Sequence, residues 1–167
     1  MTRSLDALLF ELRSGKTSRR QVVDETFRNA AALNPVLNAF ITLAPERAAS
    51  QADSLTVLRR SQRPRLYGVP VAVKDSFGTA GRRTTCGSSA LTDFVPTANA
   101  PLVDRLDRAG AILIGKTTPD EFGWGGSPEF GSARNPFAYD GRRLAARGSA
   151  SATAVVAAGT WTNTDPR

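Results

Sequence analysis

Two short apolar runs, separated by a helical segment, set the fold class of this 167-residue chain. Residues 69–73 read Val-Pro-Val-Ala-Val and residues 111–114 read Ala-Ile-Leu-Ile, and both runs are typical of strands. Pro101 can open a helix that continues to Ala109, and Gly110 is placed to end it directly before the second run. Strand, helix and strand joined by short connections predict an α/β sheet with a parallel crossover.

Helical patterns dominate the chain before these strands. Ser4 can cap a short helix with leucines along one face, and Gly15 stands where a left-handed residue ends a helix most easily. A capping box that begins at Ser18 starts a second helix, which we expect to end at Asn34-Pro35. These two helices form the first part of a helical lead-in.

A short strand over residues 38–42 and a third helix from Pro45 to Leu58 follow, and residues 61–65 are a polar linker. Residues 144–159 are Ala-rich with little amphipathic pattern, which suits a buried helix or a weakly specified tail. We therefore expect one incomplete α/β domain in three parts: a helical lead-in over 1–60, the start of the sheet core over 66–139 and a divergent tail over 140–167.

The composition excludes several classes of site. Histidine is absent and Cys86 is the only cysteine, which rules out Ser-His-Asp triads, His-ligated zinc and an internal disulfide. The net charge of +7 comes from basic residues spread along the chain, so we expect a solvated surface and no nucleic-acid partner. No apolar run approaches membrane-spanning length and no signal peptide is recognisable, so we expect a cytoplasmic protein without a membrane partner.

Lys74 is the residue that most suggests chemistry, because it closes the apolar run 69–73. A lysine in this position is unusual unless its amine faces a cavity, although an exposed strand end is an alternative explanation. Desolvation disfavours an ammonium group and can bring the pKa of a lysine from about 10.4 towards neutrality, where the amine can accept a proton. Lys74 is therefore a candidate general base.

Several short segments resemble the amidase-signature family when they are taken in order. They are the strand ending in Lys-Asp (GVPVAVKDS, 68–76), the loop TTCGSS (84–89), the joint AGAILIGKT (109–117), the loop DEFGWG (120–125) and the turn from Phe130-Gly131 to Asn135-Pro136. Each segment alone is a weak signal, but their order and spacing are specific. The resemblance covers residues 1 to about 139 and implies the N-terminal portion of that fold, a mixed sheet with flanking helices.

The resemblance also implies a catalytic apparatus. In that family a lysine matching Lys74 passes a proton through a serine on a cis peptide bond to a second, nucleophilic serine. The bridging serine lies in a Gly-Gly-Ser-Ser-Gly-Gly loop, of which this chain keeps only Gly148-Ser149, so Ser149 is the candidate. In the family the nucleophile follows a Thr-Asp-Thr-Gly-Gly stretch. Residues 162–167 (TNTDPR) resemble this stretch only faintly and contain no Gly-Gly-Ser.

Residues 141–147 (GRRLAAR) suggest why the serine loop is degraded. High-GC codons for a family-like Arg-Ser-Pro-Ala-Gly-Gly-Ser-Ser, read one base late, spell Gly-Arg-Arg-Leu-Ala-Ala-Arg. The family pattern resumes over residues 151–159, as it would after a compensating slip. The hypothesis of a reading-frame accident fails if the neighbouring frame of the gene encodes no Gly-Gly-Ser-Ser string.

Cys86 is a rival nucleophile, because a Cys-Glu-Lys set hydrolyses amides in the unrelated nitrilase-type enzymes. Glu121 and Lys74 are available as its partners. The surroundings of Cys86 lack a helix N-terminus that would lower the pKa of the thiol, and a small buried cysteine is the commoner state. A structural role therefore competes with this reading.

The resemblance implies an enzyme that converts a small-molecule carboxamide and water to a carboxylate and ammonia, without metal or organic cofactor. We expect a truncated amidase-like protein that is inactive alone, since no nucleophilic serine is recognisable. The alternative from another class is a non-catalytic remnant or an interaction module.

Overall fold

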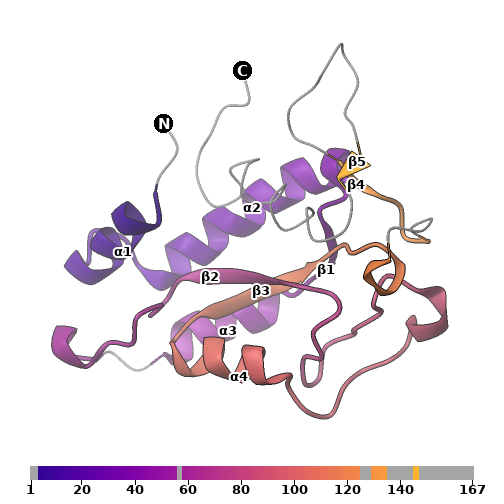
Figure 1. The fold of residues 1–167 in the computed structure, drawn as a ribbon. Coiled ribbons are helices and arrows are strands. Elements are labelled where there is room, and N and C mark those ends of the chain that lie inside the picture. Colours follow the sequence, from indigo (N-terminus) through magenta and orange to yellow (C-terminus); the bar gives the residue numbers. More distant parts are fainter. Residues whose placement is uncertain (1–3, 56–57, 125–128, 135–144, 147–167) are drawn as a thin grey trace.

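The computed structural model describes residues 4–55, 58–124, 129–134 and 145–146. Figure 1 shows a small sheet with helices packed around it. The elements are α1 (Leu5–Ser14), α2 (Arg19–Leu37), β1 (Phe40–Leu43), α3 (Pro45–Ser54), β2 (Pro70–Lys74), α4 (Pro101–Arg108), β3 (Ile112–Thr117), β4 (Ala133–Arg134) and β5 (Ala145–Ala146).

Strand β3 is the centre of a three-stranded sheet with the order β1-β3-β2. Strand β2 runs parallel to β3, and α4 lies between them in the chain, which confirms the predicted crossover. Strand β1 runs antiparallel to β3, so the sheet is mixed. The α/β fold class is therefore confirmed.

Gly115 of β3 is the point where the sheet is most crowded. It lies opposite Leu43 of β1 and Ala72 of β2, and the pairing register shifts beside it on both sides. A Cβ atom on Gly115 would lie only 2.5 Å from the carbonyl oxygen of Thr42. Only a glycine lets the backbone of β1 approach β3 this closely.

The two faces of the sheet bury different cores. Ile112 and Ile114 of β3 pack against Val23 and Ala30 of α2 and against Ala48 of α3. The opposite face packs on α4, and Figure 1 shows α2 and α4 on opposite sides of the sheet. This second core contains Val73, Val103 and Leu113. A third cluster joins α1 to the start of the sheet through Leu8, Leu12, Val22 and Val69.

Helix α1 follows the prediction, with the Ser4 side chain accepting from the backbone N–H of Ala7 and Gly15 as a left-handed C-cap. The predicted capping box of α2 is also present, between Ser18 and Gln21. These local signals act within one helical turn, which is why the sequence reveals them.

Helix α2 is longer than the sequence predicts, because Asn34-Pro35 does not end it. The helix continues to Leu37, and Asn38 is its left-handed C-cap with φ 48°. The Asn34 side chain accepts from the N–H of Phe40 at 2.7 Å and donates to its carbonyl at 3.0 Å. This tie and the burial of Leu37 compensate for the helical hydrogen bond that Pro35 cannot make.

Helix α3 is shorter than predicted and ends at Ser54 rather than Leu58. Its last carbonyl groups are satisfied by a side chain from α2 instead of by a further turn. The Arg19 guanidinium donates to the carbonyl oxygens of Ala52 at 3.1 Å and Leu55 at 3.0 Å. A long-range contact of this kind has no local sequence signal.

The sheet strands differ from the predicted runs by one to three residues. Strand β2 is displaced by one residue, and β3 continues through Gly115 to Thr117 because β1 and β2 both pair with its C-terminal half. Of the Ala-rich segment 144–159, the structure describes only Ala145–Ala146, which pair with β4. The division of the chain into lead-in, core and tail stays a prediction.

Candidate active site

Lys74 ends strand β2, and its side chain is half-buried. The Lys74 Nζ atom lies 3.3 Å from the position that a Cβ atom on Gly123 would occupy. The amine therefore lies at the start of the glycine-rich segment 123–131, although residues 125–128 of that segment lie outside the described residues. The C-terminal ends of parallel strands are the usual place for a site in an α/β sheet.

A second lysine, Lys116, lies one strand away with its side chain on the opposite face. Lys116 is paired with Val73 in the parallel ladder, and Lys74 is paired with Thr117. Because side chains alternate along a strand, Lys74 and Lys116 leave the sheet in opposite directions. Lys116 is fully buried, whereas Lys74 is half-buried.

Lys116 forms a buried ion pair with Asp75, the residue after β2. The Lys116 Nζ atom lies 3.0 Å from Asp75 Oδ1, and both side chains are 0% exposed. The ammonium group also donates to the carbonyl oxygen of Phe77 and to Thr84 Oγ1, both at 2.8 Å. Burial lowers the pKa of Lys116, and the attraction of the Asp75 carboxylate opposes this change without cancelling it.

Asp75 is held from its other side by Thr85. Asp75 Oδ2 accepts from the Thr85 backbone N–H at 2.8 Å and from its hydroxyl at 2.6 Å. The Asp75 backbone donates to the carbonyl of Thr117 at 3.0 Å. We call Lys74, Asp75, Thr84, Thr85 and Lys116 the strand-end cluster. Its charges and hydrogen bonds fix the backbone that carries Lys74.

The segment after Thr85 is bound to both strand ends by its backbone. Cys86 donates to the carbonyl of Asp75 at 3.1 Å, and its own carbonyl accepts from Phe122 at 2.7 Å. Cys86 and Gly87 both have a positive φ, of 52° and 75°. A Cβ atom on Gly87 would lie 2.9 Å from the carbonyl oxygen of Pro119, so this turn requires glycine.

Cys86 is poorly suited to be a nucleophile. Burial raises the pKa of its thiol, the Asp75 carboxylate raises it further, and Lys116 and Lys74 only partly oppose this. The thiolate, which is the reactive form, is therefore disfavoured. Glu121, the acid of the rival Cys-Glu-Lys set, accepts a hydrogen bond from the Ser88 hydroxyl at 2.8 Å.

Two carboxylates secure the loops around the cluster. Besides the Ser88–Glu121 bond, the Ser89 backbone N–H donates to Glu129 Oε2, and hydrogen bonds from Ser89 lower the pKa of Glu129. These contacts tie the loop that follows β2 to the loop that follows β3. In the part of the chain that the structure describes, no group of three or more Cys, Asp or Glu side chains is placed to hold a metal ion.

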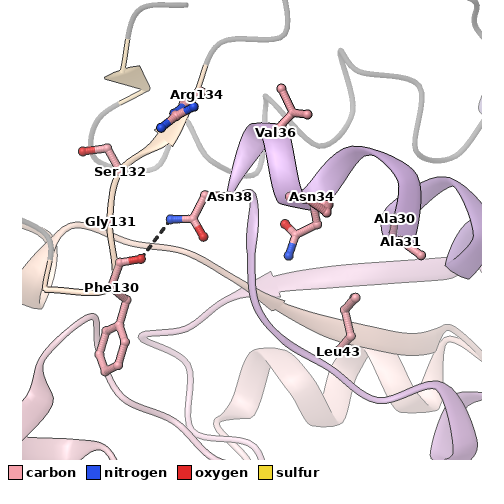
Figure 2. A pocket seen from close by; sticks show the side chains of 11 residues that line it. Ala30, Ala31, Asn34, Val36, Asn38, Leu43, Phe130, Gly131, Ser132 and Arg134 are labelled. Atoms are coloured by element: carbon pink, nitrogen blue, oxygen red, sulfur yellow. Dashed lines mark hydrogen bonds between the residues drawn. The ribbon is translucent and has the colours of Figure 1, made fainter.

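A cavity of about 830 Å³ lies between the C-terminal end of α2 and residues 130–134. Figure 2 shows the Asn38 side chain extending from the end of α2 towards Phe130, and its amide donates to the carbonyl of Phe130 at 2.9 Å. Ala30, Ala31 and Leu43 give this cavity an apolar wall. No residue of the strand-end cluster lines it, so the cavity has no direct link to the candidate lysine.

Among the predicted site residues, the structure describes Lys74 but not Ser149, which lies outside the described residues together with residues 141–144 and 147. The distance between the proposed lysine and the proposed serine is therefore untested. Sequence reasoning missed the role of Lys116, although a similar signal was present there. Like Lys74, it comes after a run of apolar residues, in this case Ile112–Ile114.

No helix among the described residues is long and apolar enough to cross a membrane.

Proteins that are similar in sequence extend well beyond the length of this chain. It is 40% identical over 154 residues to a glutamyl-tRNA(Gln) amidotransferase subunit from Prochlorococcus marinus (strain MIT 9303), covering 89% of this chain and 31% of the relative. The corresponding subunit from Koribacter versatilis is 36% identical, covering 94% of this chain and 33% of the relative. The chain thus spans about a third of the length of these relatives.

Solved structures that are similar to this chain also extend well beyond its length. A protein from a vestigial complex that reveals the evolutionary origins of an s-triazine catabolic enzyme is 35% identical, with a TM-score of 0.83 over 96% of this chain and 35% of its own. A bacterial aryl acylamidase of the amidase-signature enzymes is 28% identical, with a TM-score of 0.82 over 95% of this chain and 34% of its own. The family described as Amidase matches residues 21–162. On this match and the shared fold, the chain belongs to the amidase-signature family.

Proposed function

We propose that this chain carries the lysine end of an amide-hydrolysing site, the reaction being conversion of a small-molecule carboxamide and water to a carboxylate and ammonia. The observation that supports this most directly is the half-buried Lys74 at the end of β2, beside Gly123. On the other face of the sheet, the buried Lys116–Asp75 pair holds the backbone that carries Lys74. We further expect the protein to act in the cytoplasm.

In this proposal Lys74 is the base of a Ser-cisSer-Lys mechanism. Its amine would take a proton from Ser149, which in turn would take the proton of the nucleophilic serine as that serine attacks the amide carbon. The tetrahedral intermediate would then collapse, and the departing nitrogen would leave as ammonia after receiving the proton. Hydrolysis of the acyl-serine by water would release the carboxylate and restore the serine.

We expect the 167-residue chain alone to be inactive. Proton transfer by Lys74 can contribute roughly a hundred- to ten-thousand-fold to a rate. Hydrolysis of an unactivated amide needs far more than this, and most of it should come from a serine nucleophile and oxyanion donors. Neither is recognisable in this chain, whose residues 162–167 only faintly match the stretch that precedes the nucleophile in the family.

A chimaera tests the role of Lys74. Residues 1–139 of this chain would replace the matching part of the aryl acylamidase to which it is similar, and ammonia release from aliphatic and aryl carboxamides would be followed. We expect the chimaera to be active and Lys74→Ala to lower kcat by about a hundredfold or more. Lys16→Ala is the matched control, because the Lys16 side chain is 72% exposed and the residue follows α1 rather than a sheet strand.

Three outcomes separate the alternatives. An active chimaera whose activity survives Lys74→Ala would remove Lys74 as the base. A folded chimaera that is as inactive as its Lys74→Ala variant would favour the non-catalytic remnant or interaction module. Turnover by the unmodified 167-residue chain, above its own Lys74→Ala variant, would contradict the proposed inactivity and direct attention to Ser149, Ser151 and Cys86.

A further inference from the structure

A polar cavity of about 280 Å³ opens between α3 and α4. On the α3 side, the chain enters the helix directly after β1, whose pairing with β3 ends at Leu43 opposite Gly115. Leu113 of β3 and Val103 of α4 form an apolar floor. Side chains of α3, among them Arg47 at its N-terminal end, form the mouth.

Arg82 lines the inner wall of this cavity and is only 7% exposed. A tight turn fixes its backbone, since the Arg82 N–H donates to the carbonyl of Thr79 at 3.0 Å. Its Nε and Nη1 atoms are buried and have no hydrogen-bond partner among the described residues. Buried polar groups are nearly always hydrogen-bonded, so two open donors on one buried cation call for an acceptor in the cavity.

The charges around Arg82 leave the cavity positive. Burial and the nearby Arg47 lower the pKa of Arg82 to about 10, so its guanidinium is still charged at neutral pH. Asp107 at the rim is the opposing charge. Burial raises the pKa of its carboxyl and Asp104 adds to this, while Arg82 and Arg47 only partly oppose it. Among the described residues that line the cavity, two guanidinium groups therefore face one carboxylate.

The neighbouring polar groups that the structure describes bond elsewhere and do not accept from Arg82 Nε or Nη1. The Asn99 side chain accepts from the N–H of Ala80 at 2.8 Å and donates to Asp104 at 3.0 Å. The Gln51 amide donates to the carbonyl of Ala111 at 3.1 Å. The described residues that line the cavity thus supply no acceptor to the Nε and Nη1 atoms of Arg82.

We propose that this cavity binds a small oxyanion, a phosphate or carboxylate group, through the buried guanidinium of Arg82, with Arg47 at the mouth as a second cation. An oxyanion has oxygens to accept from the open N–H groups and a charge to balance the two arginines. The volume admits such a group together with water molecules or a small organic part. The site shares no lining residue with the strand-end cluster.

The experiment uses the ¹⁵N-labelled full chain and inorganic phosphate, with sodium chloride adjusted to keep pH and ionic strength constant. We expect saturable shifts of the Arg82 Nε–Hε signal and of the backbone amides of residues 79–82. Arg82→Met should weaken phosphate binding by about tenfold or more, because hydrogen bonds to a charged group are lost. Arg28→Ala, which changes an arginine of α2, is the matched control and should leave binding unchanged. A parallel titration with acetate distinguishes a phosphate site from a carboxylate site.

A second readout keeps the proposal testable whatever the binding variant does to the fold. Phosphate should raise the thermal midpoint of the unmodified chain, and Arg82→Met should abolish this rise while raising the phosphate-free midpoint, since it removes a buried, unpaired charge. If Arg82→Met does not fold, Arg47→Ala at the exposed mouth should still weaken binding several-fold. Absence of saturable shifts with both phosphate and acetate, or equal binding by the folded arginine variants, would overturn the proposal.

Discussion

Lys74 and Lys116 show how the same residue, after similar apolar runs, reaches two different environments. Each follows a run of strand residues, and each is at the C-terminal part of its strand. The one-residue offset in the parallel ladder, Val73 opposite Lys116, places one lysine on each face of the sheet. The fully buried Lys116 needs Asp75 as a counter-ion, whereas the half-buried Lys74 extends towards Gly123.

The first prediction concerns the buried ion pair. Asp75→Ala leaves the Lys116 ammonium buried without its counter-ion, and the free energy of unfolding should fall by roughly 3–5 kcal/mol in urea titrations. Adding Lys116→Met to the same chain should recover much of this loss, because the unpaired charge is removed. Asp24→Ala is the matched control, since Asp24 forms an exposed ion pair with Arg20, and should have a much smaller effect. Equal losses for Asp75→Ala and Asp24→Ala would mean that the buried pair contributes no more to the free energy of unfolding than an exposed pair does.

At the scale of elements, strand β3 is the central strand of the sheet, and the helices α2 and α3 pack against its residues Ile112 and Ile114. Its Gly115 allows β1 to approach so closely that Thr42, Leu43 and Phe40 all surround the position of the missing Cβ atom. The two register shifts on either side of Gly115 let β1 and β2 both follow β3 to its end.

We predict that Gly115→Ala destabilises the chain by about 1–3 kcal/mol, because the new methyl group would overlap the carbonyl oxygen of Thr42. Hydrogen exchange should show the greatest loss of protection in β1 and in the facing half of β3. Gly78→Ala is the control, since the atoms nearest to its Cβ position lie at 3.7 Å or more and Gly78 has no positive φ. A Gly115→Ala chain as stable as Gly78→Ala would show that β1 can move away from β3 at no cost.

At the scale of the whole molecule, the sequence predicts what depends on neighbours in the chain. The Ser4 and Ser18 caps, the crossover of β2, α4 and β3, and the position of Lys74 at a strand end all have signals within a few residues. Long-range contacts leave no local signal in the sequence. The Arg19 side chain that caps the end of α3 is separated from the carbonyl groups it contacts by 33 and 36 residues. For the same reason, neither the partner of Lys116 nor the open donors of Arg82 could be foreseen.

The shifted pKa values of Lys116 and Cys86 also make the stability of the whole molecule depend on pH in the alkaline range. Lys116 has a lowered pKa in the folded chain against an ordinary value of 10.5, so the unfolded chain binds more protons between these two values. Stability should therefore rise with pH in that window. Cys86 has a raised pKa against an ordinary value of 9.0, so the folded chain keeps its proton longer and stability should fall as pH rises above that value.

Because the two effects have opposite signs, the last prediction is made in a Cys86→Ser chain, which removes the effect of the thiol. Its free energy of unfolding would be compared with that of the same chain carrying Lys116→Met and Asp75→Asn, by urea titration from about pH 8 to 10. Arg82, whose pKa is also lowered, is present in both chains, so the difference isolates the buried pair. The chain with Lys116 should gain stability relative to its reference as the pH rises, with a slope of at most about 1.4 kcal/mol per pH unit. A difference that is constant or decreases with pH would mean that Asp75 stabilises the ammonium form of Lys116 at least as well as water does.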